Sequence, residues 1–336
     1  MDDNATGGAE VGGGNPKEKA ESYEDYLQLN KVLDGVRRLS QVNGDPAHDE
    51  HLFIIIHQAF EIWFKQVLFD LDSIIDIFRS GPNRDEDKML TIVNRLNRIV
   101  LIWKLVIDQF YILETMPPLN FLEFRCHLGS ASGFQSLQFR LIENKFGVKE
   151  EDRVTYGKDK YIDLMHSESS KETLKESTRV ETLFSVVEKW LESIADIDTQ
   201  FWRRYVKAIN GLEKKESFES VLEEAKYNIE KEKKSRRLSY KAFQGALRIA
   251  LCRDETGYCL PYQVMTLLTD VDSLIMKWRY NHVLMVHRMI GSKAGTGGSS
   301  GYYYLKSTVN DHYRVFIDFF NMSTFLIPRK DLNKDV

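Results

Sequence analysis

Residues 278–301 run WRYNHVLMVHRMIGSKAGTGGSSG, and this stretch restricts the fold more than any other. Its first half is an apolar segment with helical spacing that carries His282, and its second half is a loop of glycines and hydroxyl side chains. A histidine held on a helix is a common ligand of haem iron, and a glycine-rich loop lets the backbone approach a small polar ligand closely. The stretch therefore predicts a helical protein with a metal or cofactor beneath a substrate-binding loop.

Simpler interpretations of this stretch stay open at this point. A single histidine on an apolar helix face is more often a hydrogen-bonded core residue than a ligand. His287 lies five residues after His282, about 140° around a helix, so the two do not form a chelating pair. The glycine loop follows a helix, and its spacing fits neither GxGxxG nor GxxxxGKS/T, which argues against the common phosphate-binding loops.

Helical spacing extends over most of the chain. Strand-type alternation is scarce, so we predict an all-α protein, a helical bundle that encloses the cofactor pocket. The helices that we expect cover residues 23–36, 51–80, 86–114, 121–128, 134–147, 180–209, 261–290 and 302–325.

The chain divides unevenly in composition. Residues 1–20 hold few large apolar side chains and are expected to form a disordered tail. We expect residues 21–336 to form a single all-α domain. Within it, residues of about 150–238 are rich in charge and are predicted to form a smaller charged helical insertion.

Composition limits the partners and the compartment. The 336 residues carry a formal net charge of -4, which gives no general attraction to nucleic acid. We find no uninterrupted apolar run of membrane-spanning length and no secretory signal, so no membrane partner is expected. Cys126, Cys252 and Cys259 are scattered and odd in number. A reduced, cytoplasmic setting is therefore the expectation.

His57 lies within HLFIIIHQAFEIWFKQ, a second segment with a polar group on an apolar face. At helical spacing it shares one side with Phe53, Phe60 and Phe64. Such a histidine is either a core residue bonded to a buried carbonyl or an imidazole that faces an aromatic-lined cavity for a flat ligand. The residues alone do not choose between these two interpretations.

Arg125 precedes the small-residue loop Gly129–Gly133. It could bind a carboxylate through two nitrogens, which lysine cannot do, or form an ordinary surface ion pair. Phe121 lies one helical turn before it. An aromatic wall and an anion clamp would then project together.

Several long blocks of the chain point to one family. They are HDEHLFIIIHQAFEIWFKQ, FRCHLGSASGFQSLQFRLIENKFG, RRLSYKAFQGALRIAL, WRYNHVLMVHRMIGSKAGTGGSSGYYYL and DFFNMSTFLIPR. With these blocks the chain resembles the tryptophan 2,3-dioxygenase family, whose members are haem enzymes that open the indole ring of L-tryptophan. The blocks are spread from about residue 23 to residue 330.

The resemblance implies roles for the two histidines. His282 would be the axial ligand of the haem iron, supported by Trp278 one turn earlier. His57 would be the catalytic-site histidine on the substrate side, where it accepts a hydrogen bond from the indole N–H. We expect His57 to orient the substrate and do not assign it as an obligatory base.

The resemblance also implies the substrate-binding residues. Arg125 would bind the carboxylate of L-tryptophan, and Thr296 of the glycine loop would contact its amino-acid backbone. Tyr23 would reach into the pocket of a neighbouring subunit. The positions expected to line the indole pocket or the haem cavity are Phe53, Phe121, Ser132 and Gly133.

The implied reaction is O2-dependent cleavage of the indole C2=C3 bond of L-tryptophan to N-formyl-L-kynurenine, the first step of tryptophan catabolism via the kynurenine pathway. The implied assembly is a homotetramer (a dimer of dimers) with one haem b (iron protoporphyrin IX) per subunit. The alternatives are a haem dioxygenase with broader indoleamine specificity, a non-catalytic haem- and tryptophan-binding sensor on the same fold, and a helical interaction scaffold.

Overall fold

The computed structural model describes residues 22–81, 85–155, 160–195, 199–210, 218, 220–233, 236–293 and 301–332. Every regular element in these ranges is a helix, which confirms the predicted all-α class. The α-helices are α1 (Tyr23–Leu27), α2 (Leu29–Leu33), α3 (Leu39–Val42), α4 (Glu50–Arg79), α5 (Glu86–Leu113), α6 (Pro118–Arg125), α7 (Leu137–Phe146), α8 (Glu168–Ser177), α9 (Leu183–Ala195), α10 (Thr199–Asn210), α12 (Glu224–Glu232), α13 (Tyr240–Leu251), α14 (Cys259–Ile290), α15 (Gly301–Ser307), α16 (Ile317–Asn321) and α17 (Arg329–Leu332). Short 3-10 helices are η1 (Cys126–Leu128), η2 (Gly133–Gln135), η3 (Glu150–Asp152), η4 (Asp311–Tyr313) and η5 (Met322–Phe325).

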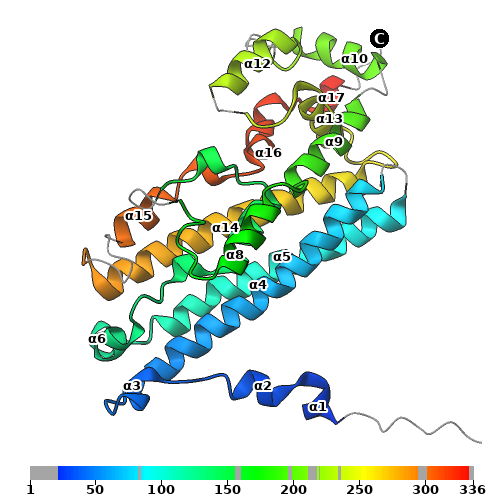
Figure 1. The fold of residues 1–336 in the computed structure, drawn as a ribbon. Coiled ribbons are helices and arrows are strands. Elements are labelled where there is room, and N and C mark those ends of the chain that lie inside the picture. Colours follow the sequence, from blue (N-terminus) through cyan, green and yellow to red (C-terminus); the bar gives the residue numbers. More distant parts are fainter. Residues whose placement is uncertain are drawn as a thin grey trace, which may run out of the picture.

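The long helices α4, α5 and α14 form the frame of the molecule. Figure 1 shows them side by side, and both α4 and α14 pack against α5. Trp103 and Val106 of α5 are fully buried in this frame. α14 contains 32 residues and so spans about 48 Å at 1.5 Å per residue. This length allows one helix to supply core residues along its course and His282 near its C-terminal end.

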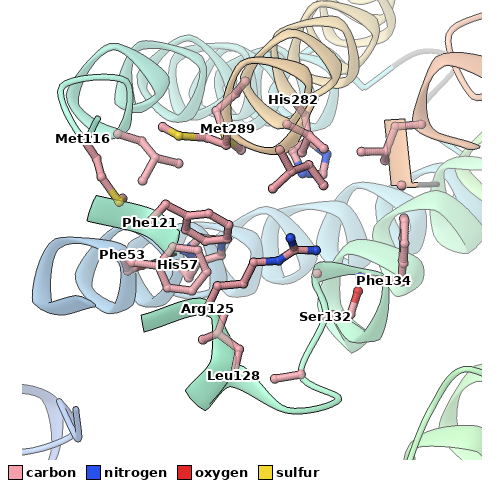
Figure 2. A pocket seen from close by; sticks show the side chains of 18 residues that line it. Phe53, His57, Met116, Phe121, Arg125, Leu128, Ser132, Phe134, His282 and Met289 are labelled. Carbon is pink, nitrogen blue, oxygen red and sulfur yellow. Dashed lines mark hydrogen bonds between the residues drawn. The ribbon is translucent and has the colours of Figure 1, made fainter. Parts of the chain in front are cut away.

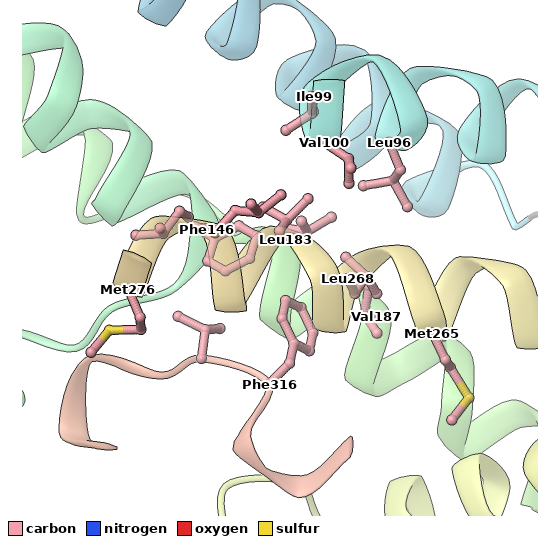
Figure 3. Close-up of a cluster of buried hydrophobic side chains, with 14 of the residues drawn as sticks. Leu96, Ile99, Val100, Phe146, Leu183, Val187, Met265, Leu268, Met276 and Phe316 are labelled. Atoms are coloured by element: carbon pink, nitrogen blue, oxygen red, sulfur yellow. The ribbon is translucent and has the colours of Figure 1, made fainter. Parts of the chain in front are cut away.

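The shorter pair α9 and α13 packs closely together beside this frame. A Cβ atom at Gly245 of α13 would lie 2.0 Å from the carbonyl oxygen of Leu191 of α9, so only glycine allows this approach. Figure 3 shows Leu183 of α9 and Leu268 of α14 in one buried hydrophobic cluster. α9 therefore contributes to the main core, although it lies within the range 150–238 expected to be a charged insertion.

One expected helix is interrupted. The segment 23–36 divides into α1 and α2 at Gln28, whose φ of 52° is left-handed and ends a helix. Neither α1 nor α2 contains a buried residue, so the described part of the chain offers their apolar side chains no core to pack against. Within the expected helix over 180–209, α9 covers Leu183–Ala195 and α10 covers Thr199–Asn210, and residues 196–198 lie outside the described residues.

The predicted helix over 302–325 is wrong. The chain forms α15, η4, α16 and η5 there, with extended residues between them. The carboxylate of Asp272 on α14 accepts hydrogen bonds from the backbone N–H groups of Val315 and Phe316, at 3.1 and 3.0 Å. These buried tertiary bonds replace the helical bonds that the local spacing favours.

Among the described helices, α4 (Glu50–Arg79) is long and apolar enough to cross a membrane by length and composition alone. Core helices pass the same test. α4 packs against α5, α7 and α9, and Phe64, Val67 and Leu71 are buried at these contacts. Ile55, Ile62 and Phe69 of the same helix are exposed, so burial in the bundle accounts for only part of its apolar character.

Candidate functional site

A cavity lies between α4, α6 and the C-terminal part of α14. Figure 2 shows side chains from these helices pointing into it, with His57 and His282 on opposite walls. Its lining is mostly apolar, as in pockets that bind small organic molecules. The lining residues are Phe53, His57, Leu113, Met116, Phe121, Arg125, Leu128, Ala131, Ser132, Gly133, Phe134, His282, Met285, Val286, Met289, Ile290, Gly301 and Leu305.

A second lobe adjoins this cavity, and both lobes are lined by His57, His282 and Phe134. It extends into the bundle between α4, α5, α7 and α14, where Phe139 and Trp278 form part of its wall. The two lobes give the two histidines access to one deep, largely apolar space.

His57 lies in the aromatic stripe that the sequence predicted on α4. Its ring centroid is 4.1 Å from that of Phe53 and 6.1 Å from that of Phe60. Its Nδ1 atom lies 2.7 Å from the carbonyl oxygen of Phe53. Because a carbonyl oxygen only accepts hydrogen bonds, Nδ1 carries the proton and Nε2 keeps a lone pair. Burial lowers the pKa of His57, so the ring is neutral at pH 7 and Nε2 is available as an acceptor.

His282 presents its ring to the cavity from α14. Burial lowers the pKa of His282 to about 4, and the nearby positive charges of Arg279 and Arg140 act in the same direction. The neutral imidazole is the form that binds a metal. The indole ring of Trp278 lies 5.2 Å from the His282 ring, centroid to centroid, and limits its orientation.

Arg125 ends α6, a short helix whose first residue is Pro118. Proline suits this position because its missing N–H would have no helical partner there. Phe121 and Arg125 are one turn apart and both line the cavity. Figure 2 shows the Arg125 side chain extending into the space between Phe121 and Ser132. The predicted pairing of an aromatic wall with a guanidinium is therefore present.

Ser132 and Gly133 line the cavity where η2 begins. The Ser132 hydroxyl accepts from the N–H of Phe134 at 3.4 Å, and the Gln135 side chain accepts from the N–H of Ser132 at 3.2 Å. This reciprocal capping fixes the loop beside the cavity. A Cβ at Gly133 would meet no atom within 4 Å, so glycine keeps this part of the wall open.

One predicted site residue, Tyr23, is not brought to this cavity. Tyr23 lies on α1, and 76% of its surface is exposed. Figure 1 shows α1 away from the end of the bundle where α6 lies. Thr296 lies outside the described residues. Their roles stay predictions.

The cavity also contains residues that the sequence analysis missed. Met116, Met285 and Met289 contribute to its apolar wall, and Arg140 and Arg279 border its second lobe. The sequence did contain a signal for this apolar wall, because Met285 and Met289 are four residues apart and so share one helix face. The two arginines gave no signal, because nothing local distinguishes them from surface arginines.

The donor set bears on the kind of metal that could bind. Among the described residues, no group of three or more His, Cys, Asp or Glu side chains could hold a metal ion. A single neutral imidazole is sufficient when a porphyrin supplies the other ligands of the iron. His282 beside an apolar cavity therefore fits haem better than it fits a bare metal ion.

Comparison with known proteins adds an independent finding. The family model described as tryptophan 2,3-dioxygenase matches residues 9–216 and 212–326. The tryptophan 2,3-dioxygenase of Rattus norvegicus is 47% identical, with 98% of this chain and 88% of the rat protein covered. The chain belongs to the tryptophan 2,3-dioxygenase family. This result confirms the resemblance that the sequence blocks indicated.

Fish and amphibian members of the tryptophan 2,3-dioxygenase family are similarly close. Tryptophan 2,3-dioxygenase B of Danio rerio and tryptophan 2,3-dioxygenase of Xenopus tropicalis are each 48% identical, with 91% of this chain and 82% of the relative covered. The similarity therefore spans the whole helical bundle and its cavity.

Proposed function

We propose that the chain is a haem-dependent L-tryptophan 2,3-dioxygenase that cleaves the indole C2=C3 bond with O2 to give N-formyl-L-kynurenine. Its membership in the tryptophan 2,3-dioxygenase family supports the reaction class. The observation that carries the proposal is the placement of two neutral imidazoles on facing walls of one deep apolar cavity.

His282 would hold the haem through its neutral imidazole. When bound, the haem supplies the iron chemistry that activates O2 for insertion across the indole double bond. The protein keeps the imidazole neutral by burying it and restricts its ring with Trp278. The iron would then lie on the His282 side of the cavity, and the space toward His57 and Arg125 would remain for the substrate.

His57 would orient the indole ring. Its Nδ1–H is held by the Phe53 carbonyl, so Nε2 accepts a hydrogen bond from a donor in the cavity. The indole N–H is such a donor. Phe53 and Phe121, whose ring centroids are 5.9 Å apart, would pack on the indole ring and exclude water. The protein thus contributes placement of the reacting bond, which is a large share of catalysis for two bound reactants.

Arg125 would bind the substrate carboxylate at the mouth of the cavity. Its planar guanidinium matches a carboxylate through two parallel hydrogen bonds. The ammonium group of the substrate would lie toward Thr296. This pair of polar contacts would make the site selective for an amino acid over a simple indoleamine.

A homotetramer of intertwined dimers is part of the proposal. Tyr23, Tyr26 and Leu33 on α1 and α2 are 76%, 74% and 66% exposed, and a second copy could cover them. Burial of such aromatic surface against a partner would be favourable. Light scattering on the purified full chain should give a mass four times the 39.1 kDa of one chain, and a monomer would contradict this assembly.

Reconstituted protein tests the function directly. Haem is added to the purified chain, the iron is reduced, and L-tryptophan is added before O2 is admitted. Absorbance of N-formyl-L-kynurenine should then increase with time. A normal haem spectrum without product would refute the dioxygenase and favour the non-catalytic sensor. A failure to bind haem would refute both the dioxygenase and the haem-binding sensor.

A further inference from the structure

Three arginines surround one buried carboxylate beside the second lobe of the cavity. Arg140 and Arg153 donate to Glu143 Oε2 at 3.0 and 2.5 Å, and Arg279 donates to Glu143 Oε1. All four side chains are at most 8% exposed. We call these four residues the arginine–glutamate cluster.

The cluster has unbalanced charge. Burial alone would raise the pKa of Glu143, but the charges of Arg153, Arg279 and Arg140 outweigh it and hold that pKa far below its usual range. Glu143 is therefore ionised, and within the described residues it is the only carboxylate in an ion pair with these arginines. The cluster then carries a net charge of +2 in the interior, which is costly without a further anion.

The excess charge faces the cavity. Arg140 and Arg279 line the second lobe, whereas Arg153 is not among its lining residues and packs over the Tyr161 ring, 4.2 Å from its centroid. The buried Nε atoms of Arg153 and Arg279 both lack a hydrogen-bond partner within the described structure, so the lining position alone separates the two arginines. Two of the three cations can therefore reach a ligand in the cavity, whereas the third supports the cluster from the other side.

We propose that Arg140 and Arg279 bind a carboxylate of the cavity's ligand, and that this carboxylate is a propionate of the haem. The inference rests on the proposed haem function. Arg279 is three residues before His282 on α14, so a porphyrin held by His282 lies beside the cluster. The other carboxylate in the reaction belongs to L-tryptophan, which Arg125 can bind in the first lobe.

A comparison of two ligands and two variants tests the assignment. Dissociation constants of haem and of haem dimethyl ester are measured by Soret titration of the haem-free full chain. The ester has the same ring and iron but lacks the negative charges. Arg140→Gln removes a cation that borders the cavity. Arg153→Gln is the matched control, because it removes a cation that pairs with the same Glu143 carboxylate but does not line the cavity.

The wild-type chain should bind haem at least about tenfold more tightly than the ester, since a hydrogen bond to a charged group is worth about one order of magnitude or more. Arg140→Gln should weaken the binding of haem by about the same factor and leave the binding of the ester nearly unchanged. Arg153→Gln should change both ligands equally. Because the wild-type comparison needs no variant, the proposal remains testable even if Arg140→Gln folds poorly.

Other results would overturn the proposal in distinct ways. Equal binding of both ligands by the wild type, or equal weakening of both in Arg140→Gln, would leave the cluster a purely structural role. If Arg140→Gln bound haem normally but lost its preference for L-tryptophan over tryptamine, the carboxylate bound by Arg140 and Arg279 would be that of the substrate and not a haem propionate. A wild-type chain that binds neither ligand would refute the proposed function as well.

Discussion

The hydrogen bond from the substrate indole to His57 can be tested by removing its acceptor. His57→Ala deletes the imidazole, and His57→Phe replaces it with a larger aromatic ring that has no polar atom but stays in the stripe with Phe53 and Phe60. The backbone carbonyl of Phe53 can still accept its helical hydrogen bond in both variants. The fold and the haem spectrum should therefore persist.

The magnitude follows from the burial of the site. In the variants, the indole N–H would enter an apolar cavity without an acceptor, which costs about 1–3 kcal/mol. This corresponds to a loss of roughly 5- to 150-fold in kcat/KM for L-tryptophan. The assay compares L-tryptophan with its N1-methyl analogue, which has no N–H to donate. The wild-type preference for L-tryptophan should fall by the same factor in both variants.

The pH dependence of the same reaction gives a second readout. Burial lowers the pKa of His57 below its ordinary value of about 6.5, so the neutral, accepting ring predominates above that pH. Activity with L-tryptophan should be constant between pH 7 and 8 and fall only on acidification below about 6.5.

The substrate comparison decides the role of His57. If His57→Ala kept the wild-type preference for L-tryptophan over its N1-methyl analogue, the assigned role of His57 would be refuted.

Three further changes have specific expected outcomes. His282→Ala should lose the Soret band, whereas His287→Ala should keep it because His287 stacks on a tyrosine ring outside the cavity lining; equal spectra would disprove the axial assignment. Arg125→Lys should raise KM for L-tryptophan by about tenfold or more without changing KM for tryptamine, and an unchanged KM for both would place Arg125 outside the binding site. Gly245→Ala should lower the free energy of unfolding by about 1–3 kcal/mol in chemical denaturation, because the new Cβ would meet a facing backbone carbonyl. Gly35→Ala is the control, because the nearest atoms to its new Cβ would be 3.4–3.6 Å away. This control should change the free energy of unfolding by less than about 0.5 kcal/mol.

Local spacing was sufficient to predict much of the site. The i, i+3 and i+4 positions around His57 gave its aromatic stripe, and the same spacing joined Phe121 to Arg125. These relations lie within one or two helical turns, where the backbone alone fixes which side chains share a face. Family membership followed from longer ordered blocks, and the comparisons confirm it.

Local spacing failed where distant groups compete with the helix. The segment 302–325 has helical spacing, but Asp272 of α14 binds the N–H groups of Val315 and Phe316 and prevents a continuous helix. Likewise, the place of α9 in the core depends on its close approach to Gly245 of α13. Neither partner is visible from the segment itself.

The sequence by itself determined the all-α class, the faces of the long helices and the residue types that are proposed to bind haem and tryptophan. Only the tertiary structure decided that His57 and His282 face each other across one cavity, and that Glu143 draws Arg140, Arg153 and Arg279 together beside it. The physical reason is the range of the interactions. Helical periodicity is a local property of the backbone, whereas the shape and charge of a cavity depend on which helix faces pack together.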